Sequence, residues 1–145
     1  MLKLLGLISL ISMLIFSQTT QASASDNRLH DMISMIKTIK DKVNSLLVNQ
    51  NIKPQTDVIK AVKDAKTELN MIKSEFAKLS PGKTEKKHYK QYLKVIKNTD
   101  QALNKAFWAA KFAGYDDKNF NDNLNKFNFY ASKVIESGKK VRPIL

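Results

Sequence analysis

Few side chains in this sequence could perform chemistry. The chain has no cysteine and only two histidines, His30 and His88, which are not paired at a His-x-x-x-His spacing. A zinc or haem site therefore has almost no ligands to draw on. Glu85 and His88 fit Glu-x-x-His, but a di-iron bundle needs two such motifs and only this one occurs. We predict no metal site, and we expect both histidines at the surface or on a helix flank.

Motifs for catalysis and for cofactor binding are also missing. The four glycines stand alone at positions 6, 82, 114 and 138, so no glycine-rich loop can cradle a phosphate. Serines are numerous, but none lies in a Gly-x-Ser-x-Gly elbow. We therefore predict no catalytic residue and no cofactor, and we expect a protein that binds rather than an enzyme.

The stretch AFWAAKFAGY, residues 106–115, offers binding chemistry instead, and it contains the only tryptophan of the chain. On a helix that advances about 100° per residue, Phe107 and Ala110 fall on the apolar stripe, whereas Trp108 points about 150° away from it. Phe112 and Tyr115 fall on the side of Trp108. Following this outward line backwards adds a row of lysines, so the candidate binding residues are Lys90, Lys94, Lys97, Lys105, Trp108, Phe112 and Tyr115.

Two interpretations of this row compete. In the first, the lysines meet phosphates or carboxylates while the indole buries apolar area at a wet boundary, as in a protein or membrane interface. In the second, the lysines only face solvent, and a loop or a second subunit covers Trp108. The candidate covers are the 114–119 connector, with Tyr115 folded back, and the 49–55 loop.

Helices must position these residues. Three groups of breaking residues divide the chain, at 49–54, 80–82 and 114–117, and between them apolar residues recur at helical spacing. The sequence predicts helices over about 27–48, 57–79, 85–113 and 118–137, followed by a tail over 138–145. Thr56 or Asp57 is placed to cap the second helix, and Gly114 is placed to end the third in a left-handed conformation.

Four helices with short connectors and one apolar stripe each predict an all-α fold, an antiparallel up-down-up-down four-helix bundle. A three-helix bundle with the first helix packed separately is the alternative. The stripes predict the following core: Leu29, Met32, Ile33, Ile36, Ile39, Val43, Leu46, Leu47, Val58, Val62, Ala65, Leu69, Ile72, Phe76, Leu79, Tyr89, Tyr92, Ile96, Thr99, Leu103, Ala106, Phe107, Ala110, Phe120, Leu124, Phe127, Ala131 and Val134.

The first 24 residues predict a cleavable signal peptide. Lys3 precedes an apolar run over 4–16, and Ala22-Ser23-Ala24 is a small-x-small cleavage site, so we expect cleavage between Ala24 and Ser25. The run is shorter than the roughly 20 apolar residues of a membrane-spanning helix. We therefore expect a secreted or periplasmic protein with a single domain over 25–145, and the composition, rich in Lys, Asn and Ile, is typical of a bacterial source.

The expected mature chain is strongly cationic, with 24 basic residues against 13 acidic ones and a net charge of +11. Such a charge favours anionic partners. We expect an acidic protein or envelope component, because a bare polyanion would not require clustered aromatic residues. The alternatives are a membrane-active or envelope-associated protein that binds anionic lipid or polymer and, less favoured, a protein that holds unfolded clients. Nucleic acid is an unlikely partner for an exported chain without a base-reading motif.

Overall fold

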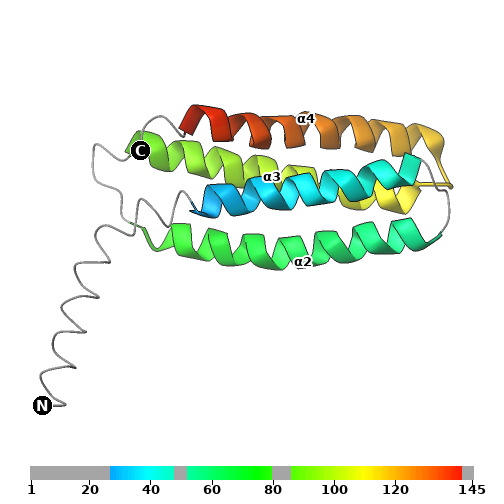
Figure 1. Cartoon of the computed structure of the whole chain (residues 1–145), viewed down its shortest axis with the longest axis horizontal. Coiled ribbons are helices and arrows are strands. Elements are labelled where there is room, and N and C mark those ends of the chain that lie inside the picture. The colour runs from blue at the N-terminus through cyan, green and yellow to red at the C-terminus, as the bar shows by residue number, and fades with distance from the viewer. Residues whose placement is uncertain (1–26, 48–51, 80–85, 142–145) are drawn as a thin grey trace, which may run out of the picture.

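The computed structural model describes residues 27–47, 52–79 and 86–141, and this part of the chain is almost wholly helical, without a strand. The first helix covers residues 27–47, and it is followed by α2 (Ile52–Ala77), α3 (Lys86–Phe112) and α4 (Asp117–Val141). Figure 1 shows the four helices lying side by side with alternating directions. The predicted signal peptide and its cleavage site lie outside the described residues.

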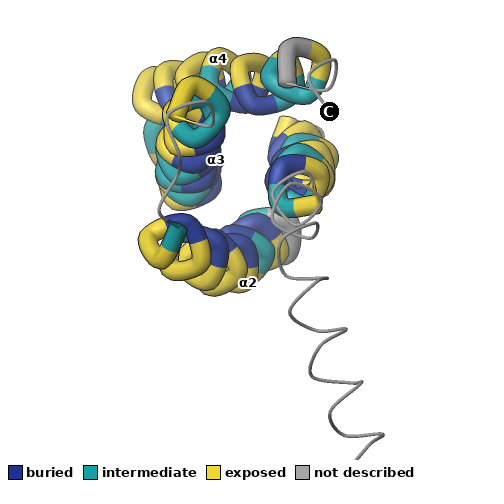
Figure 2. The backbone as a smooth tube through the Cα atoms, turned by 90° about the vertical axis from the view of Figure 1, so that its left-hand side faces the viewer, coloured by how far each residue is buried: buried dark blue, intermediate teal, exposed yellow. Residues whose placement is uncertain are grey.

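The four helices form one bundle, as the sequence predicts. Seen from the end in Figure 2, they occupy the corners of a square, and the buried surface of each faces the centre. Helices adjacent in sequence are adjacent in space: α3 packs against both α2 and α4, while the first helix lies diagonally across from α3. The first helix is therefore an integral corner of the bundle, and the three-helix alternative is wrong.

The predicted apolar stripes form the core. Side chains such as Met32, Ile72, Leu103 and Phe127 are fully buried. The predicted core residues that are only partly buried pack against its edge: Ile33, Leu79, Tyr89, Phe107 and Phe120. One prediction is wrong, because the side chain of Leu47 is 58% exposed at the end of the first helix.

A second buried seam on α3 was not predicted. Val95, Ala102 and Ala109 recur every seven residues beside the expected stripe, and all three are buried. These residues lie on the flank of α3 opposite the flank that carries Phe107. A helix with two neighbours buries a wider arc than a single heptad line, and the two alanines leave room for close packing.

Two helix boundaries differ from the prediction. α2 begins at Ile52 rather than at 57, so Pro54 lies in its first turn, where the missing backbone N–H has no intrahelical partner to lose. Thr56 and Asp57 are consequently inside the helix and not at its cap. α4 runs on to Val141 through Gly138, where an added Cβ would lie 2.6 Å from Cδ1 of Ile33.

The connection between α3 and α4 matches the prediction closely. Gly114 has a φ of 80°, the left-handed conformation expected after α3. Asp116 then caps α4: its Oδ1 accepts a hydrogen bond from the backbone N–H of Asn119 at 3.0 Å, and its Oδ2 accepts one from the Asn119 side chain at 2.7 Å. These two devices turn the chain within four residues and fix the end of α3 that carries the aromatic residues.

Candidate interaction surface

The outward row of α3 is the candidate site, and we call it the lysine–aromatic face. Its members are Lys90, Lys94, Lys97, Lys105, Trp108, Phe112 and Tyr115. The structure places six of them on α3 and Tyr115 in the turn that follows. Lys90, Lys94 and Lys97 are exposed, while Lys105 and Phe112 are half-buried. The row therefore lies on the outside of the bundle, as helical periodicity predicts.

Trp108 is the centre of a row of three rings. Its indole meets the Phe107 ring edge to face, at 5.4 Å between centroids and 85° between planes. On its other side it stacks on Phe112 at 5.8 Å and 27°. Phe107 packs against the core and carries the Lys111 ammonium 5.6 Å from its centroid. Trp108 thus packs against a ring on each side although 47% of its surface is exposed.

Tyr115 does not join these rings. Its side chain is 83% exposed, and the expectation that it folds back over Trp108 is wrong. The left-handed Gly114 redirects the chain before Tyr115. The 49–55 loop, the other expected cover, lies partly outside the described residues, but Gln55 at its end donates a hydrogen bond to the carbonyl oxygen of Ala113. The start of α2 and the end of α3 therefore meet at one end of the bundle.

The charge of α3 is almost entirely positive. The helix contains seven lysines against a single aspartate, Asp100, a net charge of +6. Lys73 of α2 pairs with that aspartate at 3.4 Å. Within the described ranges no ion pair involves a lysine of the lysine–aromatic face. The positive charge of the face is therefore available to an outside anion.

A further exposed aromatic residue, Phe129 on α4, was missed. Its side chain is 55% exposed, the Lys133 ammonium lies 4.4 Å from its ring centroid, and Tyr130 meets it edge to face at 5.3 Å. The signal was available in the sequence, because Phe129 lies about 200° around the helix from the core residue Phe127. α4 thus repeats the pairing of lysine with an outward aromatic ring beside α3.

The histidines occupy the positions expected of them. His30 is exposed on the first helix, with Nδ1 3.4 Å from the Ser34 hydroxyl, and His88 is half-buried near the start of α3. Among the described residues no three His, Cys, Asp or Glu side chains are grouped so that they could hold a metal ion.

None of the described helices is both long enough and apolar enough to cross a membrane.

Comparison with known proteins adds no family or relative to this description. The chain matches no protein-family model, no curated protein and no solved structure.

Proposed function

We propose that this protein is an exported, non-enzymatic binding protein that docks on an acidic partner through the lysine–aromatic face. One observation carries the proposal: a row of lysines that form no ion pair with the described residues ends in a Trp108–Phe112 stack that is open to solvent. Lysines supply attraction and faster encounter, whereas buried aromatic rings supply most of the affinity of an interface. A surface that only faces solvent has a use for lysines, but it has none for a cluster of exposed aromatic rings.

An acidic protein surface fits this combination of lysines and aromatic rings better than a plain polyanion does. The rings need an apolar pocket on the partner, and the lysines need carboxylates around that pocket. Because exposed charges are screened beyond about 8 Å at physiological ionic strength, we expect binding to weaken with salt without vanishing. A purely electrostatic complex would lose nearly all affinity in high salt.

The test is capture of partners by the exported chain, residues 25–145, from the medium into which it is secreted. The variant Trp108→Ser/Phe112→Ser should lose the captured protein. Met71→Ser is the matched control, since Met71 is 60% exposed on α2, outside the face, and it should capture as the unmodified chain does. Equal capture by both variants would place the binding site elsewhere.

Anionic lipid is the competing partner, and vesicles distinguish it. Under our proposal, the chain binds vesicles of anionic phospholipid no more tightly than its charge alone requires, so Trp108→Ser/Phe112→Ser leaves vesicle binding unchanged. Tight, salt-sensitive binding to anionic but not neutral vesicles, lost in that double variant, would instead assign the face to a membrane surface.

A further inference from the structure

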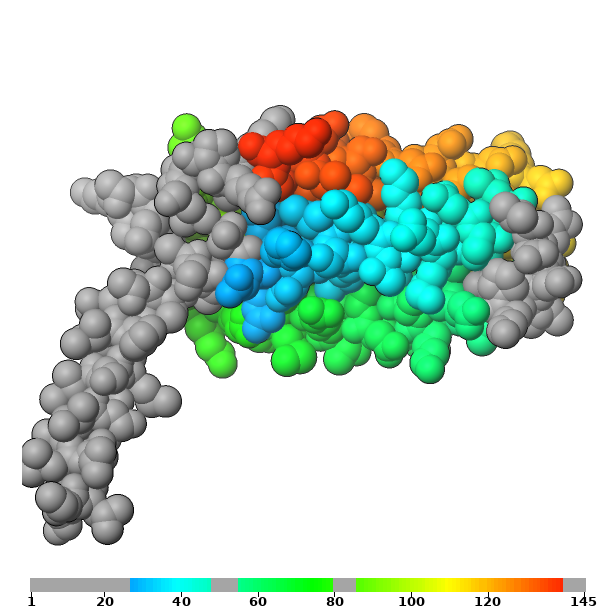
Figure 3. Space-filling model, in the orientation of Figure 1, coloured from blue at the N-terminus to red at the C-terminus, as the bar shows by residue number. Residues whose placement is uncertain are grey.

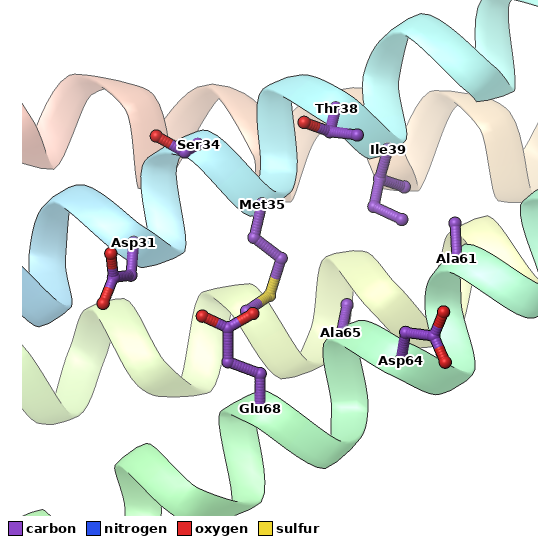
Figure 4. A pocket seen from close by; sticks show the side chains of 9 residues that line it. All are labelled: Asp31, Ser34, Met35, Thr38, Ile39, Ala61, Asp64, Ala65 and Glu68. Atoms are coloured by element: carbon purple, nitrogen blue, oxygen red, sulfur yellow. The ribbon is translucent and has the colours of Figure 1, made fainter.

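The opposite side of the bundle carries a groove of contrary charge. A hollow of about 410 Å³ opens between the first helix and α2. Figure 4 shows its lining, which comes from both helices: Asp31, Ser34, Met35, Thr38, Ile39, Ala61, Asp64, Ala65 and Glu68. We call it the acidic groove, because carboxylates stand at its rim while Met35, Ile39 and Ala65 form a buried apolar floor.

The groove is acidic because the acids of α2 lie on the flank that faces the first helix. On one flank, Lys66 and Lys73 bond to Asn104 and Asp100 of α3. On the other flank, Glu75 forms a two-point ion pair with Arg28 of the first helix, with Oε2 2.7 Å from Nε. All four acids of α2 share this second flank, at spacings of seven, four and seven residues: Asp57, Asp64, Glu68 and Glu75.

Small side chains make the hollow. Ala61 and Ala65 face the first helix across the seam, and they leave space that larger apolar residues would fill. Met35 extends from the first helix toward α2 and forms part of the floor (Figure 4). An apolar floor under an acidic rim suits a guest that combines an aromatic ring with flanking ammonium groups.

The lysine–aromatic face of a second copy is such a guest. Two carboxylates of the groove form no ion pair among the described residues, Asp64 and Glu68, and both lie within one turn of the floor residue Ala65. Lys105 lies within one turn of Trp108 on α3, so it is opposite in sign to these carboxylates and at a similar distance from the ring. Trp108 and Phe112 would provide the ring that the floor can cover.

The positions of the lysine–aromatic face and the acidic groove limit how copies can join. In Figure 2, α3 and the seam between the first helix and α2 lie on opposite sides of the bundle. Figure 3 shows the side on which the first helix lies between α2 and α4. One copy cannot bring its own face into its own groove, so each contact joins a groove to the face of the next copy. Such a heterologous contact leaves one groove and one face free at the ends and can propagate.

We infer that the acidic groove binds the lysine–aromatic face of a second copy of this chain, giving a reversible head-to-tail assembly that high salt weakens. The inference rests on the proposed function, since it names the chain itself as one acidic partner of the face. The net charge of +11 expected for the exported chain, residues 25–145, opposes association over long distances, but a Debye length of about 8 Å at physiological ionic strength screens that repulsion while close charge pairs persist.

Sedimentation velocity of the exported chain tests this assembly. The average sedimentation coefficient should rise with protein concentration at physiological ionic strength, and the rise should shrink in high salt. Glu68→Lys should weaken self-association by at least about tenfold, as the loss of a close charge pair does. Glu136→Lys is its matched control, with the same change of charge at an exposed α4 position, and it should retain association. Melting curves verify the fold of each variant, and Asp64→Lys replaces Glu68→Lys if the latter is unfolded.

The mixing experiment isolates the head-to-tail arrangement. Lys105→Glu should also abolish self-association, whereas Lys63→Glu on α2 should not. An equimolar mixture of Glu68→Lys and Lys105→Glu retains one intact groove and one intact face, so it should form pairs and stop at two copies. A chain that stays monomeric at physiological ionic strength, or a Glu68→Lys variant that associates normally, would overturn the inference. Loss of the captured protein in Trp108→Ser/Phe112→Ser, with a monomeric chain, would leave the proposed function standing alone.

Discussion

The indole of Trp108 stacks on Phe112 one turn further along α3, with 5.8 Å between ring centroids, while nearly half of the tryptophan surface remains open to solvent. The stack belongs to the surface and not to the core. Its neighbour Phe107 links it to the core cluster. An interface side chain that is already oriented loses little further entropy on binding, which is why the stack is central to the proposal.

Trp108→Ser should therefore reduce the free energy of unfolding by only about 1–2 kcal/mol, the worth of aromatic contacts and of partial burial. Phe127→Ala is the comparison, because Phe127 is fully buried and its truncation should cost about 3–5 kcal/mol. Urea unfolding followed by circular dichroism measures both values. A tryptophan variant as unstable as the Phe127 variant would show that the indole is a core residue.

Two glycines should respond differently to alanine. Gly114 has a φ of 80°, so Gly114→Ala should cost about 1–2 kcal/mol from backbone strain alone. Gly138 lies inside α4, where alanine gains about 1 kcal/mol of helix propensity, offset by the displacement of the Ile33 Cδ1 atom 2.6 Å from the new Cβ. Thermal melts should show a clear loss for the first variant and a small change for the second.

The cap of α4 predicts a dependence on pH. Hydrogen bonds from the backbone N–H and then from the side chain of Asn119 hold the pKa of Asp116 below its usual value. Because the pKa is lower in the folded state than in the unfolded chain, the stabilisation is complete above the unfolded pKa and is lost as pH falls through the folded pKa. At neutral pH, Asp116→Ala should melt at a lower temperature than the unmodified chain. At acidic pH, the two melting temperatures should converge. A constant difference down to the lowest pH would contradict this role.

The buried hydroxyl of Thr99 predicts a conservative outcome. It donates to the carbonyl oxygen of Val95 at 2.7 Å inside α3, an oxygen that also belongs to the helix ladder. Thr99→Val removes this bond while keeping the shape, so we expect a change in unfolding free energy below about 1 kcal/mol. Thr99→Ser keeps the hydroxyl but deletes a buried methyl, and it should cost about 1 kcal/mol. If Thr99→Val lost more unfolding free energy than Thr99→Ser in urea unfolding, the hydroxyl, and not the methyl, would stabilise this layer.

Most of the fold could be predicted from the sequence because helical periodicity is local. The heptad spacing of residues such as Val62, Leu69 and Phe76 identifies both a helix and its buried side. The same rule, applied to residues off the stripe, placed Trp108 outside. Two predictions were wrong because they ignored the position of the residue in its helix. Leu47 fits the apolar stripe but lies at a helix end, and Pro54 is a helix breaker that is tolerated in a first turn.

The helices, their apolar sides and the outward phase of the lysine–aromatic face follow from the sequence alone, since each depends on residues within a few turns of one another. Which helices share a seam follows from packing in three dimensions. Asp31 and Glu68 are far apart in sequence, and they line one groove because the first helix and α2 are antiparallel neighbours. The second seam of α3 and the approach of Ile33 to Gly138 likewise depend on neighbouring helices. Periodicity defines the faces of a helix, whereas packing defines what each face meets.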